Sequence, residues 1–139
     1  MSRCLFTTVR KANRSLFRFY QEALTEADIS IVQLAILRSL ERKSPRSLPD
    51  LSEDLVMERT SLYRTIKPLI EMGALEVFQS ETGRTKHAEL TNHGQELIKK
   101  TMPYWQKAQD AILNDLGKDQ WEEISELLLD LPNVISKIR

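Results

Sequence analysis

The stretch that decides the fold runs from Met57 to Gly94 and reads MERTSLYRTIKPLIEMG, then ALEVFQSETGRTKHAELT, then NHG. Its first part has the period of an amphipathic helix, about 3.6 residues. The apolar residues that recur with this period are Leu62, Ile66, Leu69 and Ile70. The second part has turn residues at Ser80–Gly83, where Gly83 can adopt a positive φ, between segments predicted as strands over 74–79 and 85–90. We therefore predict a helix, a two-stranded ribbon and the start of another helix.

The opposite face of this helix is polar and carries no acidic residue between Arg59 and Ile70. It interleaves basic side chains with short hydroxyls, which suits contact with phosphates and base edges in a DNA groove. The ribbon would place two further basic residues beside it, flanked by His87. We predict DNA contacts from Arg59, Thr60, Ser61, Tyr63, Arg64 and Lys67 of the helix and from Arg84 and Lys86 of the ribbon. The alternatives are a solvated helix face and ordinary hairpin charges.

A short helix precedes this stretch and begins near Pro49, which suits a first helical turn because its missing N–H is not needed there. Leu51 and Leu55 form its apolar side. A tight turn over Val56–Glu58 leads into the polar helix. Two short helices joined by such a turn, the second with a polar face, are typical of a helix-turn-helix motif.

Helical patterns flank this motif on both sides. We predict helices over 4–24, 31–40, 92–116 and 119–131, a loop over 41–47 and further helical spacing after Pro132. Thr91 is a favourable N-cap, Gly73 and Gly117 are favourable helix ends, and Pro68 and Pro103 predict a kink or bend inside helices. The predicted fold class is mainly α with a small β-ribbon wing: a winged helix-turn-helix region joined to N- and C-terminal helices.

The composition favours one globular domain. The chain has 139 residues, of which 41% are hydrophobic and 29% charged. No apolar run approaches the roughly 20 residues of a membrane span, and no signal-peptide pattern opens the sequence. A single cysteine excludes an intramolecular disulfide and favours the reducing cytoplasm. The 20 basic and 20 acidic residues balance, so an electrostatic attraction to DNA must come from charges that segregate within the fold.

The terminal segments are segregated in charge and unusually apolar. Residues 1–20 contain five basic residues and no acidic one, whereas residues 110–130 contain seven acidic residues and one lysine. These are either two solvated faces or two helices that meet across a dimer or domain junction. The first helix also carries a heptad-like seam of Leu5, Val9, Ala12, Leu16, Phe19 and Ala23. Such apolar surface predicts a partner, most simply a second copy.

Six short segments, in this order and spacing, carry a family resemblance across nearly the whole chain. They are IVQLAILRSL (31–40), LSEDL (51–55), ERTSLYRTIKPLIEMG (58–73), ALEV (74–77), Gly83–Arg84 and LTNHG (90–94). Together they resemble the MarR family of bacterial winged helix-turn-helix regulators. The resemblance implies a homodimer, interlocked through helical regions 1–29 and 95–139, with residues 30–94 as the DNA-binding region.

The same resemblance implies a pseudo-palindromic operator, usually repression, and release by a small phenolic or aromatic ligand or by oxidation. The chain departs from the family pattern at the wing. The family usually has an aspartate two residues before the wing arginine, and this position is Thr82 here, next to Glu81. The departure puts the orientation of Arg84 in question.

Effector and redox residues have several interpretations. The aromatic residues Phe17, Tyr20 and Trp105 are either core or dimer packing or the lining of an effector cleft. Cys4 is the one candidate for oxidation, since Arg3 would favour its thiolate, but a buried or merely exposed cysteine is the alternative. The loop residues Arg42, Lys43 and Arg46 either touch flanking phosphates or are solvated.

The sequence suggests neither a metal site nor an enzyme. Two histidines, His87 and His93, and a distant cysteine are a poor ligand set for zinc. No glycine-rich phosphate loop and no Ser/His/Asp constellation are present, so we expect no cofactor. We predict a cytoplasmic, homodimeric, sequence-specific DNA-binding transcriptional regulator, a repressor released by a small-molecule or oxidative signal. The alternative is a winged-helix protein-interaction module that does not bind DNA.

Overall fold

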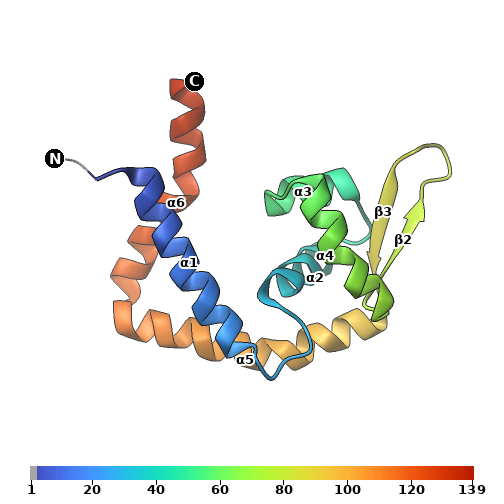
Figure 1. The fold of residues 1–139 in the computed structure, drawn as a ribbon, viewed down its shortest axis with the longest axis horizontal. Coiled ribbons are helices and arrows are strands. Elements are labelled where there is room, and N and C mark those ends of the chain that lie inside the picture. Colours follow the sequence, from blue (N-terminus) through green and yellow to red (C-terminus); the bar gives the residue numbers. More distant parts are fainter. Residues whose placement is uncertain (1–2) are drawn as a thin grey trace. The chain divides into compact units, whose positions relative to one another are not determined.

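The computed structural model describes residues 3–139, which form six α-helices and one small sheet (Figure 1). The elements are α1 (Leu5–Ala23), α2 (Ile31–Arg42), β1 (Arg46–Ser47), α3 (Leu48–Leu55), α4 (Arg59–Glu71), β2 (Leu75–Gln79), β3 (Lys86–Leu90), α5 (Asn92–Leu116) and α6 (Lys118–Ile138). The chain divides into two units, residues up to Trp105 and Gln106–Arg139, and α5 runs through the boundary. The predicted mainly α fold with a β-ribbon wing is confirmed.

A buried core holds α2, α3, α4 and the sheet together within the first unit (Figure 1). Helix α4 contributes Leu62, Ile66 and Leu69, whose exposed fractions are 2% or less, as the apolar period predicts. Ile70 was predicted to lie on the same side but is 41% exposed. It follows Leu62 by eight residues and so lies about 80° further around the helix. The core therefore fixes which face of α4 points outward.

The sheet has three antiparallel strands in the order β1-β3-β2, whereas the sequence analysis predicted two. The additional strand lies in the predicted loop, where Arg46 pairs with Ala88 and Ser47 with His87. The Ser44 hydroxyl also accepts the N–H of Leu90 at 2.9 Å. A two-residue strand is too short to show an alternation of apolar and polar residues. Its pairing also depends on residues about 40 positions away, so the sequence did not indicate it.

Local capping explains where the helices of the winged region begin and end. Ser47 caps α3 by accepting the N–H of Asp50 at 3.1 Å, and Pro49 lies in the first turn as predicted. Val56 ends α3 in the left-handed conformation with φ of 51°, which makes the tight turn into α4. Helix α4 continues through Pro68 to Glu71.

The glycines behave differently from one another. Gly73 and Gly117 have φ of 78° and 84°, so both predicted helix ends are confirmed. The turn predicted over Ser80–Gly83 is present, and it forms without the positive φ that Gly83 could adopt. The wing loop closes through the N–H of Ser80, which donates to the carbonyl of Thr85 at 3.1 Å. This longer loop spreads the chain reversal over several residues, whereas a two-residue hairpin turn would require positive φ.

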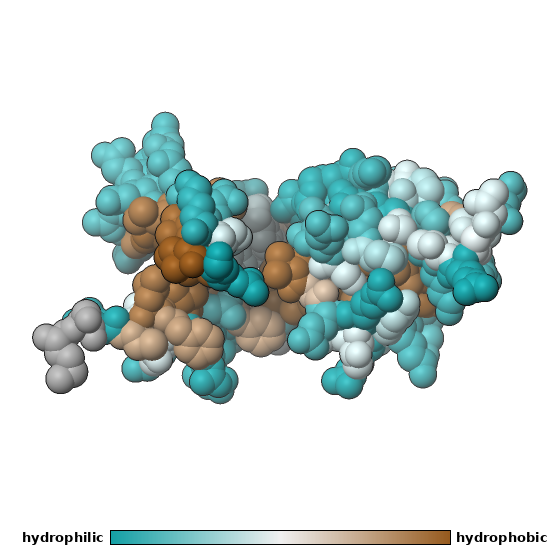
Figure 2. Space-filling view, turned by 90° about the horizontal axis from the view of Figure 1, so that it is seen from above, coloured by the Kyte–Doolittle hydropathy of each residue, from teal (hydrophilic) through white to brown (hydrophobic). Residues whose placement is uncertain are grey.

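Helix α6 continues through Pro132 to Ile138, beyond the end predicted at Leu131. Neither α1 nor α6 contains a buried residue, although both carry many apolar side chains. Hydrophobic surface is visible as brown areas in Figure 2, and the exposed large residues of α6 include Leu127, Leu128 and Leu129. None of the described helices is both long and apolar enough to cross a membrane.

Candidate nucleic-acid interface

The outward face of α4 carries all six residues that were predicted to contact DNA from this helix. They are Arg59, Thr60, Ser61, Tyr63, Arg64 and Lys67, all of them exposed, with Tyr63 at 46%. The face exists because Leu62, Ile66 and Leu69 are held in the core on the other side. The structure thus brings these six side chains together on one solvent-facing surface, which we call the α4 polar face.

The basic residues of this surface have no acidic partner within the described chain. None of the ion pairs among residues 3–139 involves Arg59, Arg64, Lys67, Arg84 or Lys86. Uncompensated cations on one surface attract a polyanion, and they release its counterions on binding. Segregation of charge within the fold, rather than net charge, therefore supplies the positive surface.

The wing places Arg84 in the loop between β2 and β3 and Lys86 at the first position of β3, both exposed. Within residues 3–139 no carboxylate pairs with Arg84, and the neighbouring Glu81 makes no ion pair either. His87, which was predicted to flank Arg84 together with Lys86, follows Lys86 in β3. It is half-buried and stacks on Phe78 with ring centroids 5.6 Å apart, because alternate residues of a strand face opposite sides.

The basic loop residues are engaged in a network that the sequence did not suggest. Asp54 accepts the Ser39 hydroxyl at 2.5 Å and Arg42 Nη2 at 3.1 Å. Arg46 Nη1 lies 3.6 Å from the carboxylates of both Asp50 and Asp54, and its side chain is only 10% exposed. The Ser39 hydrogen bond, followed by the two arginines, lowers the pKa of Asp54. The network ties α2, β1 and α3 together.

Cys4 is exposed and immediately precedes α1. The backbone N–H of Thr7 is the main cause that lowers the pKa of its thiol, followed by the Thr7 hydroxyl. Of the two alternatives, a buried and an exposed position, the structure shows the exposed one, and the groups that lower the pKa of the thiol belong to the first turn of α1.

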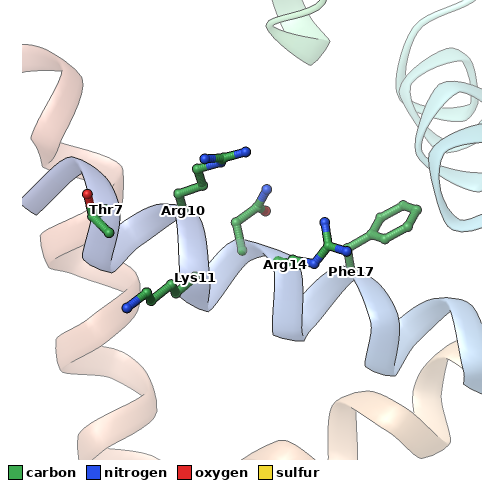
Figure 3. A pocket seen from close by; sticks show the side chains of 6 residues that line it. Thr7, Arg10, Lys11, Arg14 and Phe17 are labelled. Atoms are coloured by element: carbon green, nitrogen blue, oxygen red, sulfur yellow. The ribbon is translucent and has the colours of Figure 1, made fainter.

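Of the three aromatic residues considered for an effector, Phe17 and Tyr20 lie on α1 and Trp105 lies on α5. Phe17 is 46% exposed and borders a hollow of about 500 Å³ along α1 (Figure 3). The other residues that line this hollow are Thr7, Arg10, Lys11, Asn13 and Arg14. Tyr20 packs edge to face on Phe19, and burial raises the pKa of its hydroxyl. Trp105 is half-buried and packs against the core of the first unit.

Arg38 is a candidate that the sequence analysis missed. Its guanidinium carbon lies 5.0 Å from the centroid of the Trp105 ring, within the range of a cation–π interaction. Its Nε atom is buried and has no hydrogen-bond partner in the described chain. The sequence signal that could have identified Arg38 is a charged residue between Leu37 and Leu40, which are both buried in α2. No group of three or more His, Cys, Asp or Glu side chains within residues 3–139 could hold a metal ion.

Comparisons with known proteins give a family match over the middle of the chain and a relative that matches nearly its whole length. A family model described as a winged helix DNA-binding domain matches residues 29–94. An uncharacterized HTH-type transcriptional regulator of Staphylococcus aureus strain Mu50 is 26% identical over 140 residues, which is 99% of this chain and 96% of that protein.

Solved structures with the same fold include three transcriptional regulators. MosR of Mycobacterium tuberculosis in complex with DNA superposes with a TM-score of 0.86 at 24% identity, over 99% of each chain. BpsR of Bordetella bronchiseptica, whose DNA binding is regulated by 6-hydroxynicotinic acid, gives 0.85 at 18% identity, over 95% of each chain. A variant of Escherichia coli MarR with operator DNA gives 0.82 at 20% identity, over 91% of this chain and 92% of that one.

Proposed function

We propose that the chain is a winged-helix transcriptional regulator of the MarR type that acts as a homodimeric repressor on a pseudo-palindromic operator. The observation that carries the proposal is the α4 polar face, whose exposed basic and hydroxyl side chains have no competing acidic partner among the described residues. Such a helix suits insertion into a major groove.

The predicted residues fall into three groups in this proposal. Arg64, Thr60, Ser61 and Tyr63 contact base edges or phosphates, whereas Arg59 and Lys67 contact the backbone. Arg84 and Lys86 of the wing reach the adjacent minor groove, where narrow A·T tracts attract arginine. The two recognition helices of a dimer would enter successive major grooves roughly 34 Å apart. We accordingly assign residues 30–94 to DNA binding.

Residues 1–29 and 95–139 are proposed to form the dimerisation region. The exposed apolar residues of α1 and α6 support this role, because a monomer would leave them in water. In α6 these residues include Ile124, Leu128 and Ile135, which recur at the four- and seven-residue spacings of a coiled-coil seam. A two-fold dimer would bury both seams and place two winged regions side by side.

A small aromatic effector is proposed to release the repressor. The regulation of BpsR by 6-hydroxynicotinic acid supports an aromatic ligand in a protein of the same fold. In this chain the support is Trp105 with the Arg38 guanidinium above it, while Phe17 and Tyr20 are further candidates on α1. An effector can act only if it binds one separation of the two winged regions better than the other.

Oxidation of Cys4 is the second proposed signal, because its exposed thiol has a lowered pKa. Operator affinity of the protein and of Cys4→Ser, each with and without peroxide, tests it, and equal responses would refute it. We further propose that the protein works in the cytoplasm and has no enzymatic activity.

Selection of bound sequences from a random DNA library tests the proposed function. We expect enrichment of a pseudo-palindrome whose half-sites lie one helical turn apart, about 10 base pairs. Arg64→Ala should relax the preference at one position of each half-site, whereas Lys99→Ala, which removes an exposed cation of α5, should select the same sequence. Recovery of unenriched DNA would instead support a protein-interaction module.

A further inference from the structure

The C-terminal end of α4 is held by two backbone hydrogen bonds that leave it little freedom. The N–H of Gly73 donates to the carbonyl of Ile70, and the N–H of Ala74 donates to the carbonyl of Leu69, both at 2.9 Å. This pair of bonds around a residue with positive φ is a Schellman motif. Leu69 and Ala74, the two positions at which the motif commonly has an apolar contact, are both fully buried in the same core.

A single hydroxyl then joins this end of α4 to the beginning of α5. The Oγ1 atom of Thr91 donates to the carbonyl of Gly73 at 2.6 Å and accepts the N–H of Gly94 at 3.0 Å. The first bond reaches the residue that ends α4, and the second caps α5. The backbone N–H of Thr91 adds a third bond, to the carbonyl of Ala74 at 3.2 Å.

Gly94 allows the two helix ends to approach this closely. A Cβ atom at Gly94 would lie 2.1 Å from the carbonyl oxygen of Ala74 and 2.6 Å from Cδ1 of Leu90. The backbone of the first turn of α5 therefore rests directly on the residue after Gly73. We call Gly73, Ala74, Thr91 and Gly94 the α4–α5 joint.

We propose that Thr91 is a positioning residue for DNA recognition, which acts through the α4–α5 joint and not by contact with DNA. The Leu75–Leu90 pair is the end of the β2–β3 ladder that adjoins this joint. A two-stranded ladder by itself would permit α4 to twist relative to α5. The Thr91 bridge to Gly73 adds an attachment beyond the ladder and fixes the direction of α4 relative to α5. Helix α5 continues into the second unit. The joint therefore sets the orientation in which the α4 polar face meets an operator. This inference rests on the proposed DNA-binding function.

The alternative role for Thr91 is a simple helix cap, and three substitutions separate the two roles. Thr91→Ser keeps both hydrogen bonds. Thr91→Asp keeps the acceptor for Gly94, because aspartate is a good N-cap, but removes the donor to Gly73. Thr91→Val removes both while it keeps the shape. A capping role predicts that the aspartate variant resembles the wild type, whereas the positioning role predicts that it resembles the valine variant.

The first measurement is operator affinity of the full-length chain as the spacing between half-sites is changed by one base pair, which rotates them by about 35°. We expect the wild type and Thr91→Ser to lose at least roughly tenfold in affinity on this change. Thr91→Asp and Thr91→Val should bind the best operator roughly tenfold less tightly, as expected for a lost hydrogen bond, and should depend little on spacing. A purely structural loss would weaken all spacings equally and overturn the proposal.

The second measurement needs no DNA, so it distinguishes failure of this inference from failure of the proposed function. Spin labels at Thr60→Cys in α4 and Lys99→Cys in α5, both exposed, would report the distance between the helices in a Cys4→Ser background. Pulsed EPR should give one narrow distance distribution with Thr91 or serine and a broader one with aspartate or valine. Equal widths in all four proteins overturn the proposal, whether or not the chain binds DNA.

Discussion

Of the four glycines, Gly94 has the least room for a side chain. We expect Gly94→Ala to destabilise the fold by about 1–3 kcal/mol, because its methyl group would overlap a backbone carbonyl that the sheet and the Schellman motif hold in place. The measurement is urea unfolding followed by circular dichroism. Gln95→Ala, at the exposed neighbouring position of α5, is the matched control and should change stability by less than about 0.5 kcal/mol.

Equal unfolding midpoints for the two variants would contradict the close approach of Gly94 and Ala74. A midpoint of Gly94→Ala above that of the wild type would contradict it more strongly, because the substitution would then act only by restricting the unfolded chain.

Asp54 provides a prediction about pH. Its folded pKa is lowered by Ser39 and the two arginines, so its contribution to stability is present at neutral pH and is lost as pH falls below about 4 through the folded pKa. We expect Asp54→Asn to be less stable by about 1–2 kcal/mol at pH 7, and this difference should shrink toward zero on acidification. Chemical unfolding of both proteins at a series of pH values measures the difference.

Glu41→Gln is the control for this experiment, because Glu41 is exposed and forms no ion pair within the described chain. A stability difference between Asp54→Asn and the wild type that stayed constant down to pH 2 would refute the assigned role of Asp54.

At the scale of elements, we expect α4 to make two kinds of contact with DNA, one to base edges and one to phosphates. We expect Arg64→Ala to cost about 1–3 kcal/mol of operator binding and to relax specificity at one base pair. Lys67→Ala should weaken specific and scrambled duplexes alike and reduce the salt slope by about one unit, since it contacts only phosphate. Competition titrations with single-base variants of the operator distinguish the two patterns, and identical profiles for both variants would contradict the assignment.

Local chemistry made much of the fold predictable. The N-cap at Thr91, the helix end at Gly73 and the buried side of α4 depend on residues within a few positions of one another. The first two predictions are confirmed, and the third holds for Leu62, Ile66 and Leu69 but not for Ile70. Strand β1 and the network around Asp54 were missed, because each joins residues from separate elements. Ser39 and Asp54, for example, are 15 positions apart.

The candidate site could be predicted only in part for the same reason. The period of α4 predicted an exposed polar face, and the structure confirms the exposure, while the DNA contacts of its residues stay predictions. The cation–π contact of Arg38 with Trp105 joins two helices that are distant in sequence, so no local pattern indicated it. The wing arginine was identifiable, but its lack of a carboxylate partner required the structure.

At the scale of the whole molecule, the terminal helices determine the assembly. We expect Leu128→Asp to shift the protein from dimer to monomer at micromolar concentration, because it places a charge in the exposed apolar seam of α6. Analytical ultracentrifugation measures the mass, and circular dichroism checks that the helices remain. Asn133→Asp adds the same charge about 140° around the helix and should leave the dimer intact. A monomeric wild type would contradict the proposed assembly.

The most direct test of DNA recognition by the α4 polar face is a fluorescence-anisotropy titration against DNA from upstream of the chain's own gene. We predict nanomolar binding that is weaker for a scrambled duplex and that falls steeply between about 50 and 200 mM salt, because each neutralised phosphate contributes a slope of about −0.9. Arg64→Ala should remove most of the preference for the specific duplex. Equal affinity for specific and scrambled DNA, or no binding at low salt, would contradict the account.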